Sequence, residues 1–218
     1  MDNRTLPLPD QINFQLALEQ AMKIASIKLS EADVELQCCN AGAKLETADG
    51  SKSIIAEYLG QPYRITLPKL EIAPTDPQIT IQPREKLLIL HYIINADGSP
   101  LCGNMLTYKE IAEGATYYPT FYKRSIKPLV DNFGDNPKRL LEVAALMSGR
   151  ESEYGDVSVT INAFRNVPLT FVLWRGDEEF PADGSILFDG NISGYLSAED
   201  ITVLCEIIAW KLVKAARQ

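Results

Sequence analysis

Strand-like and helical segments follow one another in blocks along this chain of 218 residues, and that order constrains the fold most. Two helical segments come first, then short strands up to residue 81, a helical middle region, more strands and a last helix. Strands and helices alternate in a doubly wound sheet, so the blockwise order favours the α+β class. We expect one α+β domain over residues 10–218, with small, mostly antiparallel sheets, about six helices and the C-terminal helix on the core. Residues 1–9 are expected to form a flexible N-terminal segment.

Local patterns predict the separate elements. Gly42 is a left-handed stop for the second helix, and Pro83 begins a helix that is apolar nearly all round. Pro128 should kink a later helix, because its ring clashes with the carbonyl four residues earlier. Ser197 caps the last helix. The predicted helices cover residues 10–28, 30–42, 83–95, 107–114, 119–133, 136–147 and 197–217, and the clearest predicted strands cover 52–58, 62–67, 157–161, 169–174 and 186–188.

The chain is acidic, with a formal net charge of −8, so its composition argues against nucleic acid and anionic membrane surfaces as partners. Its most apolar stretch, residues 87–94, is too short to span a bilayer, and no signal peptide is recognised at the start. The four cysteines include no C-x-x-C pair, which favours reduced thiols over a zinc or iron–sulfur site. We therefore expect a soluble, cytoplasmic protein.

The segment from Leu173 to Asp200 is the most distinctive part of the chain, because it combines a tryptophan with seven carboxylates. We expect the strand end at Trp174 and the acidic turn Asp177–Glu179 to border a ligand-binding cleft, with Asp189 folding back toward that turn. His91, the only histidine, is most simply a core residue with a satisfied hydrogen bond, and it is kept as a weaker candidate. The candidate ligand-binding residues are Trp174, Asp177, Glu178, Glu179, Asp189 and His91.

Two other kinds of chemistry stay open in the sequence. Carboxylates of the acidic turn, with Asp189, would suit acid–base work or a hard metal ion, although a calcium loop would need alternating ligands and Pro181 breaks that pattern. The carboxylate hypothesis predicts two of these groups in one cleft and a raised pKa on one of them. The aromatic and basic stretch from Tyr117 to Lys127 would suit a phosphate or carboxylate ligand, although a solvated helix face explains it more simply. Phosphate-binding glycine loops are missing from the sequence.

Several segments together resemble one family of bacteria and archaea, domain of unknown function 3786. They are residues 89–93, 98–101, 132–134, 173–181, 187–189 and 195–200, and the similarity extends over about residues 10 to 215. The family has no assigned activity, so the resemblance implies no catalytic residues. Some members follow a cysteine-rich segment of the iron–sulfur type, which implies anaerobic redox or corrinoid settings. This chain has no such segment, and any redox link would come from a partner.

The sequence therefore predicts a non-enzymatic, cytoplasmic binding or accessory domain for an unknown small molecule or protein partner. A carboxylate-based enzyme, with or without a metal ion, is one alternative, and a structural subunit with a large apolar surface is another. The sequence identifies no cofactor.

Overall fold

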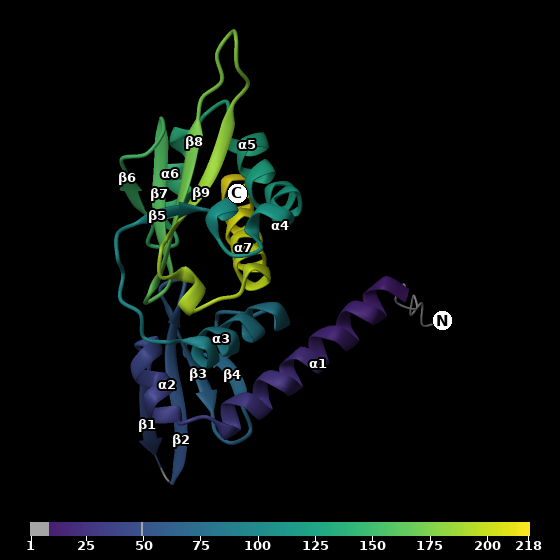
Figure 1. Cartoon of the computed structure of the whole chain (residues 1–218), viewed down its shortest axis with the longest axis vertical. Helices are drawn as coiled ribbons and strands as arrows, with labels where there is room; N and C mark the ends of the chain where they lie inside the picture. The colour runs from purple at the N-terminus through teal and green to yellow at the C-terminus, as the bar shows by residue number, and fades with distance from the viewer. Residues whose placement is uncertain (1–8, 49) are drawn as a thin grey trace.

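The computed structural model describes residues 9–48 and 50–218, which form two antiparallel sheets with helices packed around them (Figure 1). About 45% of the chain is helical and 25% is strand, so the predicted α+β class is confirmed. The α-helices are α1 (Pro9–Glu31), α2 (Val34–Ala41), α3 (Pro83–Asn95), α4 (Gly114–Phe121), α5 (Lys127–Phe133), α6 (Lys138–Ala145) and α7 (Ala198–Ala216). The strands are β1 (Lys44–Ala48), β2 (Ser51–Tyr58), β3 (Gln61–Thr66), β4 (Glu71–Pro74), β5 (Met105–Thr107), β6 (Arg150–Ser152), β7 (Val157–Phe164), β8 (Val167–Trp174) and β9 (Asp183–Asp189).

The first sheet is a meander in the order β1-β2-β3-β4. The predicted hairpin of β2 and β3 is confirmed, with Ile54 opposite Ile65 in the register. Gly42 ends α2 in the left-handed conformation (φ 63°), as its position in the sequence predicts. The helix begins at Asp33, whose side chain accepts hydrogen bonds from two backbone N–H groups, and not at Ser30.

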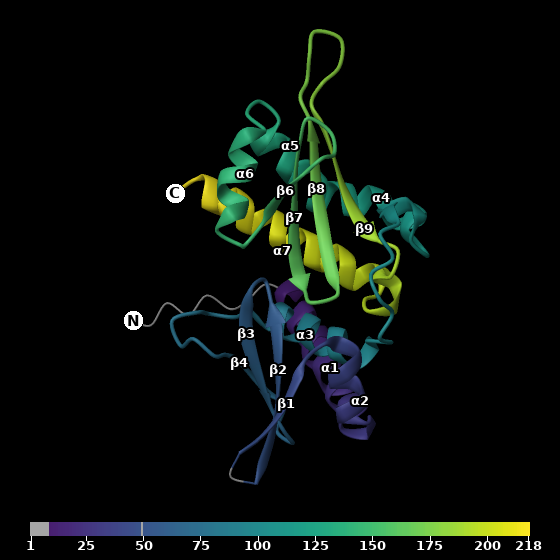
Figure 2. The same cartoon turned by 90° about the vertical axis from the view of Figure 1, so that its left-hand side faces the viewer.

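The second sheet has the order β5-β9-β8-β7-β6, with β8 in its centre. Nearly every residue of β8 is buried, which fits a short continuous apolar run. β8 and β9 form a long hairpin whose loop extends beyond the rest of the molecule (Figures 1 and 2). The C-terminal helix α7 packs on the core, as expected.

One kinked helical run joins α4, a π-helical turn at Tyr122–Ile126 and α5. Within it the Lys127 N–H donates to the Tyr122 carbonyl, five residues back. Pro128 follows directly, so the widened turn falls where the proline was expected to disturb the helix. With this run counted once, six helices lie in the part of the chain that the structure describes, in agreement with the expected number.

Aromatic side chains join the two sheets. The ring of Tyr92 on α3 stacks on Phe164 at the end of β7, with 4.1 Å between the ring centroids. Tyr58 of β2 lies 5.1 Å from the same phenylalanine ring. The backbone continues the contact, since the Leu59 N–H donates to the Ala163 carbonyl. The first sheet with α1 to α3 and the second sheet with the later helices are the two halves of the molecule, and their buried residues form one cluster.

The first helix, α1, leads away from this body (Figure 1). Ala25 and Leu29 in its second half are buried against the core, whereas the described side chains of its first half are mostly exposed. The first half of α1 is therefore an arm of the molecule.

The sequence patterns miss several short elements. Strands β1, β5 and β6 were not predicted, and the helix predicted over residues 107–114 is wrong, because only a 3₁₀ turn forms at Tyr108–Glu110. The capping box that motivated it, Thr107 with Glu110, is present. Residues 1–8 of the predicted flexible segment lie outside the described residues, and Pro9 already belongs to α1. None of the described helices is long and apolar enough to cross a bilayer.

Candidate functional site

The predicted site residues lie at separate places. Trp174 ends β8 opposite Asp183, the first residue of β9, whereas Asp189 is the last residue of β9. Six residues of extended strand separate the two ends of β9 by about 20 Å. The expected cleft, with Asp189 folded back toward the acidic turn, is therefore wrong. Whether any one of these side chains binds a ligand stays a prediction.

The acidic turn is ordered by its own backbone. The Asp177 carboxylate accepts hydrogen bonds from the N–H groups of Glu179 (2.8 Å) and Phe180 (2.7 Å). These bonds, first that from Phe180, lower the pKa of Asp177. Glu178 and Glu179 are exposed beside it. In residues 9–48 and 50–218, no three His, Cys, Asp or Glu side chains gather as a metal site would need.

Asp189 is a buried carboxylate that holds a loop. It accepts hydrogen bonds from the backbone N–H groups of Cys102 (3.0 Å), Gly103 (2.7 Å) and Asn191 (3.1 Å) and from the Cys102 thiol. Burial alone would raise the pKa of Asp189, but these donors hold it below its usual value. The raised pKa that the carboxylate hypothesis predicted is thus found neither on Asp177 nor on Asp189.

His91 links two helices. Its Nδ1 lies 2.7 Å from the Asp200 carboxylate at the start of α7, and the Ser197 hydroxyl donates to the other oxygen of Asp200. Burial alone would raise the pKa of Asp200, but the bonds from His91 and Ser197 lower it. Because the aspartate lies between the serine and the histidine, the imidazole cannot take the serine proton, as a nucleophilic triad requires. The arrangement joins α3 to α7, so the hydrogen bond of His91 is satisfied as expected, although its side chain is partly exposed and not in the core.

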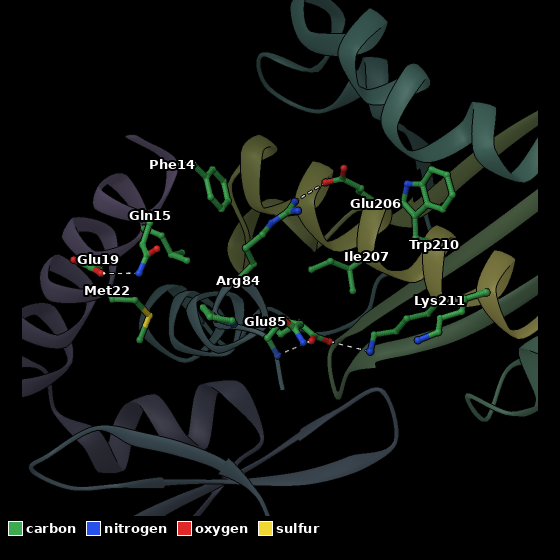
Figure 3. A pocket seen from close by; sticks show the side chains of 14 residues that line it. Phe14, Gln15, Glu19, Met22, Arg84, Glu85, Glu206, Ile207, Trp210 and Lys211 are labelled. Atoms are coloured by element: carbon green, nitrogen blue, oxygen red, sulfur yellow. Dashed lines mark hydrogen bonds and ion pairs between the residues drawn. The ribbon is translucent and has the colours of Figure 1, made fainter. Parts of the chain in front are cut away.

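The candidate site is a groove between α1, the first turn of α3 and α7, with a volume of about 1070 Å³ (Figure 3). Phe14 and Met22 of α1 lie on one side, and Ile207 and Trp210 of α7 on the other. Trp210 is 47% exposed, although its neighbours on α7 at positions 208, 209 and 212 are fully buried. An indole on the outer side of a packed helix leaves apolar area without a partner, so the groove is the best candidate for binding.

Charged side chains line the floor of the groove. Glu206 accepts hydrogen bonds from the guanidinium groups of Arg84 and Arg124, and Glu85 pairs with Lys211 at 3.1 Å. Burial alone would raise the pKa of Glu206, but the two arginines hold it below its usual value. These pairs fix the first turn of α3 against α7, and they leave Lys214 at the edge of the groove.

The aromatic and basic stretch from Tyr117 to Lys127 forms ion pairs and lines part of a smaller cavity. Arg124 reaches Glu206, and Lys127 pairs with Asp131 one turn later at 2.7 Å. Tyr117 and Arg124 also line a smaller cavity of about 490 Å³ beside the start of α7. The phosphate or carboxylate ligand considered for this stretch stays a prediction.

Sequence reasoning missed the groove residues. The buried stripe of α7, which contains Leu204, Ile208 and Leu212, places Trp210 about 180° away around the helix. A tryptophan opposite the buried face of a confidently predicted helix was therefore a usable signal. No local pattern pairs Arg84 with Glu206, because 122 residues separate them.

Comparison with protein families gives one match. Residues 33–210 match the family described as domain of unknown function DUF3786, which is more than half of the chain. The chain belongs to this family. No curated protein and no solved structure matches it. The match begins after α1, so most of the DUF3786 region is the two-sheet body, and the α1 wall of the groove precedes it.

Proposed function

We propose that this DUF3786 protein is a non-enzymatic binding or accessory domain whose groove receives the apolar side of a short amphipathic helix from a protein partner. The observation that carries the proposal is the groove itself, which has apolar walls on α1 and α7 and the half-exposed Trp210. Grooves between helices are a recurring way to bind an amphipathic helix.

The size of the groove supports a helical occupant. A helix about 10 Å wide and 14 Å long, or roughly nine residues, fills about 1100 Å³. The groove measures about 1070 Å³ and is partly open to solvent. A helix of two to three turns would therefore cover Phe14 and Trp210 together, which a smaller ligand would cover only in part.

Charge favours an acidic residue on the flank of the occupant that meets α7. The charged residues that line the groove balance, with Glu19, Glu85 and Glu206 against Arg84, Lys211 and Lys214. Arg84 and Lys211 are already paired with Glu206 and Glu85, whereas Lys214 forms no ion pair with the described residues. An acidic residue of the occupant would meet Lys214, giving specificity and faster association more than raw affinity.

The setting of the protein is part of the same proposal. A cytoplasmic location is supported by Cys38, Cys39, Cys102 and Cys205, which are all free thiols. An accessory role in anaerobic redox or corrinoid metabolism rests on the family resemblance alone. A structural subunit of a complex, one alternative from the sequence, would use the same apolar surface.

The proposal can be tested with Trp210 as a reporter. The Trp174→Phe variant leaves Trp210 as the only tryptophan, and a peptide of about twelve residues, with leucines on one helical face and glutamates beside them, serves as the probe. Binding in the groove should shift Trp210 emission to shorter wavelength, with saturation at one peptide per chain. A scrambled peptide of the same composition should leave the emission unchanged.

Two variants locate the binding. Ile207→Asp places a charge in the groove wall and should abolish the shift, whereas Leu146→Asp, at an exposed leucine at the end of α6, should not. If the peptide binds equally well to Ile207→Asp, or if neither the peptide nor the apolar dye anilinonaphthalene sulfonate binds, the groove is not a binding site. Binding of the dye alone would favour a small-molecule ligand and overturn the helical occupant.

A further inference from the structure

Helix α1 carries apolar side chains on two opposite sides. One side, with Met22, Ala25 and Leu29, faces the body of the molecule. On the other side Leu16, Ile24 and Ile27 are 51%, 55% and 48% exposed. At 100° per residue these three lie within about 80° of one another and opposite the buried side.

Such a stripe differs from ordinary surface composition. Single exposed apolar residues are common, but Leu16, Ile24 and Ile27 share one face of a helix whose opposite face is already buried, with Gln20 and Lys23 between them. A helix gains most of its stability from packing, and the first half of α1 receives little from its own chain (Figure 1). We call the side of α1 with Leu16, Ile24 and Ile27 its outer face, and it is the candidate docking face.

We propose that this outer face pairs with the same face of a second copy of the chain, with the two α1 helices antiparallel. A two-fold axis between residues 21 and 22 places Leu16 opposite Ile27 of the second copy, and this contact occurs twice. Ile24 of each copy then lies beside Gln20 of the other. The stripe is thus complementary to itself at Leu16 and Ile27, while Ile24 packs on the side chain of Gln20.

The charges of α1 favour the antiparallel arrangement. Glu19 and Lys23 lie on the same flank of the outer face, about 40° apart. In an antiparallel pair each Lys23 comes near Glu19 of the other copy, so two ion pairs form across the axis. In a parallel pair this flank would instead face the opposite flank of the other copy, which carries Lys28 and not Glu19, so these ion pairs would not form.

The expected dimer is weak and leaves the groove open. α1 is about 34 Å long, and one helix pair of this length lies at the low end of specific interfaces, so the dimer should dissociate on dilution. Phe14 and Met22 line the groove from the inner side of α1, away from the outer face, and Glu19 lies between the two sides, at the groove and on the flank of the outer face. The inference therefore does not rest on the proposed function, and the second copy would stiffen one wall of the groove.

Sedimentation velocity across a wide range of concentrations tests the dimer. The full chain should change from monomer to dimer as its concentration rises, and Leu16→Glu should remain a monomer throughout. Leu146→Glu is the matched control, since Leu146 is also an exposed leucine, and it should behave as the unchanged chain. Circular dichroism of each variant checks that it is folded. A chain that is monomeric at every concentration, or a Leu16→Glu variant that still dimerises, overturns the proposal.

A charge exchange tests the orientation. Lys23→Glu alone should weaken the dimer about tenfold, since it replaces two attractive contacts by repulsive ones. The double variant Lys23→Glu with Glu19→Lys should restore the original affinity. Failure of the double variant to recover overturns the antiparallel register, and loss of the dimer in Trp210→Ala would place the contact in the groove instead.

Discussion

Buried and half-buried carboxylates in this protein hold separate segments together. The Asp200 carboxylate is hydrogen-bonded to His91 and Ser197. Asp189 accepts hydrogen bonds from three backbone N–H groups, and Glu206 accepts hydrogen bonds from two arginines. In each case the bonds lower the pKa against the effect of burial. An ionised acid that accepts several bonds stabilises the folded chain only while it stays ionised.

Asp200 predicts a pH dependence of stability. Its pKa is lower in the folded state than the unfolded value of about 3.9, so its contribution is present above that value and is lost as the pH falls through the folded pKa. Urea unfolding at pH 7 and at several values below pH 5 measures it. Asp200→Asn should lower the free energy of unfolding by about 2 kcal/mol at pH 7 and by less in acid. An equal loss at every pH would contradict this role.

Asp189→Asn should destabilise the protein, because the amide offers one good acceptor where the carboxylate offers two. At least one of the N–H groups of Cys102, Gly103 and Asn191 would lose its partner, at a cost of about 1–3 kcal/mol. The Cys102 thiol should also react faster with a thiol reagent, since the loop that it belongs to loosens. Asp177→Asn at the exposed turn is the control, and it should leave both measurements nearly unchanged.

Apart from the exposed Trp210, no feature of the sequence indicated the candidate site, because its residues come from distant segments of the chain. The groove requires Phe14, Arg84 and Trp210 to meet, and each belongs to a different segment of the chain. The acids after Trp174 stood out because they are close in sequence, yet they lie in the exposed loop of the β8–β9 hairpin, away from Asp189. Unusual residues that are close together in the sequence therefore did not come together as a site in the structure.

At the scale of elements, strong local chemistry was predictable. Gly42, Pro83 and Ser197 mark helix ends through backbone conformation or capping, which act within a few residues, and all three occur as predicted. Strands β5 and β6 have three residues each and exist only through pairing with β9 and β7. A short edge strand of this kind has no sequence period to detect, which is why both were missed.

The cap of α7 gives a prediction at this scale. The Ser197 hydroxyl accepts the Asp200 N–H at 3.2 Å and donates to the Asp200 carboxylate. Ser197→Ala removes both bonds and should lower the free energy of unfolding by about 1–2 kcal/mol, whereas Ser197→Thr keeps the hydroxyl and should lose little. Urea unfolding of the two variants measures the difference. Equal losses would show that the hydroxyl does not cap the helix.

At the scale of the whole molecule, the connection between the two sheets decides whether they fold together. Its contacts include the rings of Tyr58 and Tyr92 around Phe164, the ion pairs between α3 and α7, and the bond between His91 and Asp200. The single domain expected from the sequence remains a prediction, and the shared cluster of buried residues supports it.

Phe164→Ala tests that prediction directly. Removing a fully buried ring between the sheets should cost about 3–5 kcal/mol, whereas Phe180→Ala at the exposed hairpin loop should cost less than about 0.5 kcal/mol. Circular dichroism reports on helices of both halves, while Trp174 at the end of β8, read in a Trp210→Phe background because Trp210 lies in the groove between the halves, reports on the half with the second sheet. In a single cooperative unit the two signals change at the same urea concentration, both in the unchanged chain and in Phe164→Ala, with the midpoint lowered in the variant. If fluorescence keeps its midpoint in Phe164→Ala while circular dichroism acquires an earlier step, the halves unfold separately, and the groove that spans them would open without loss of the second sheet.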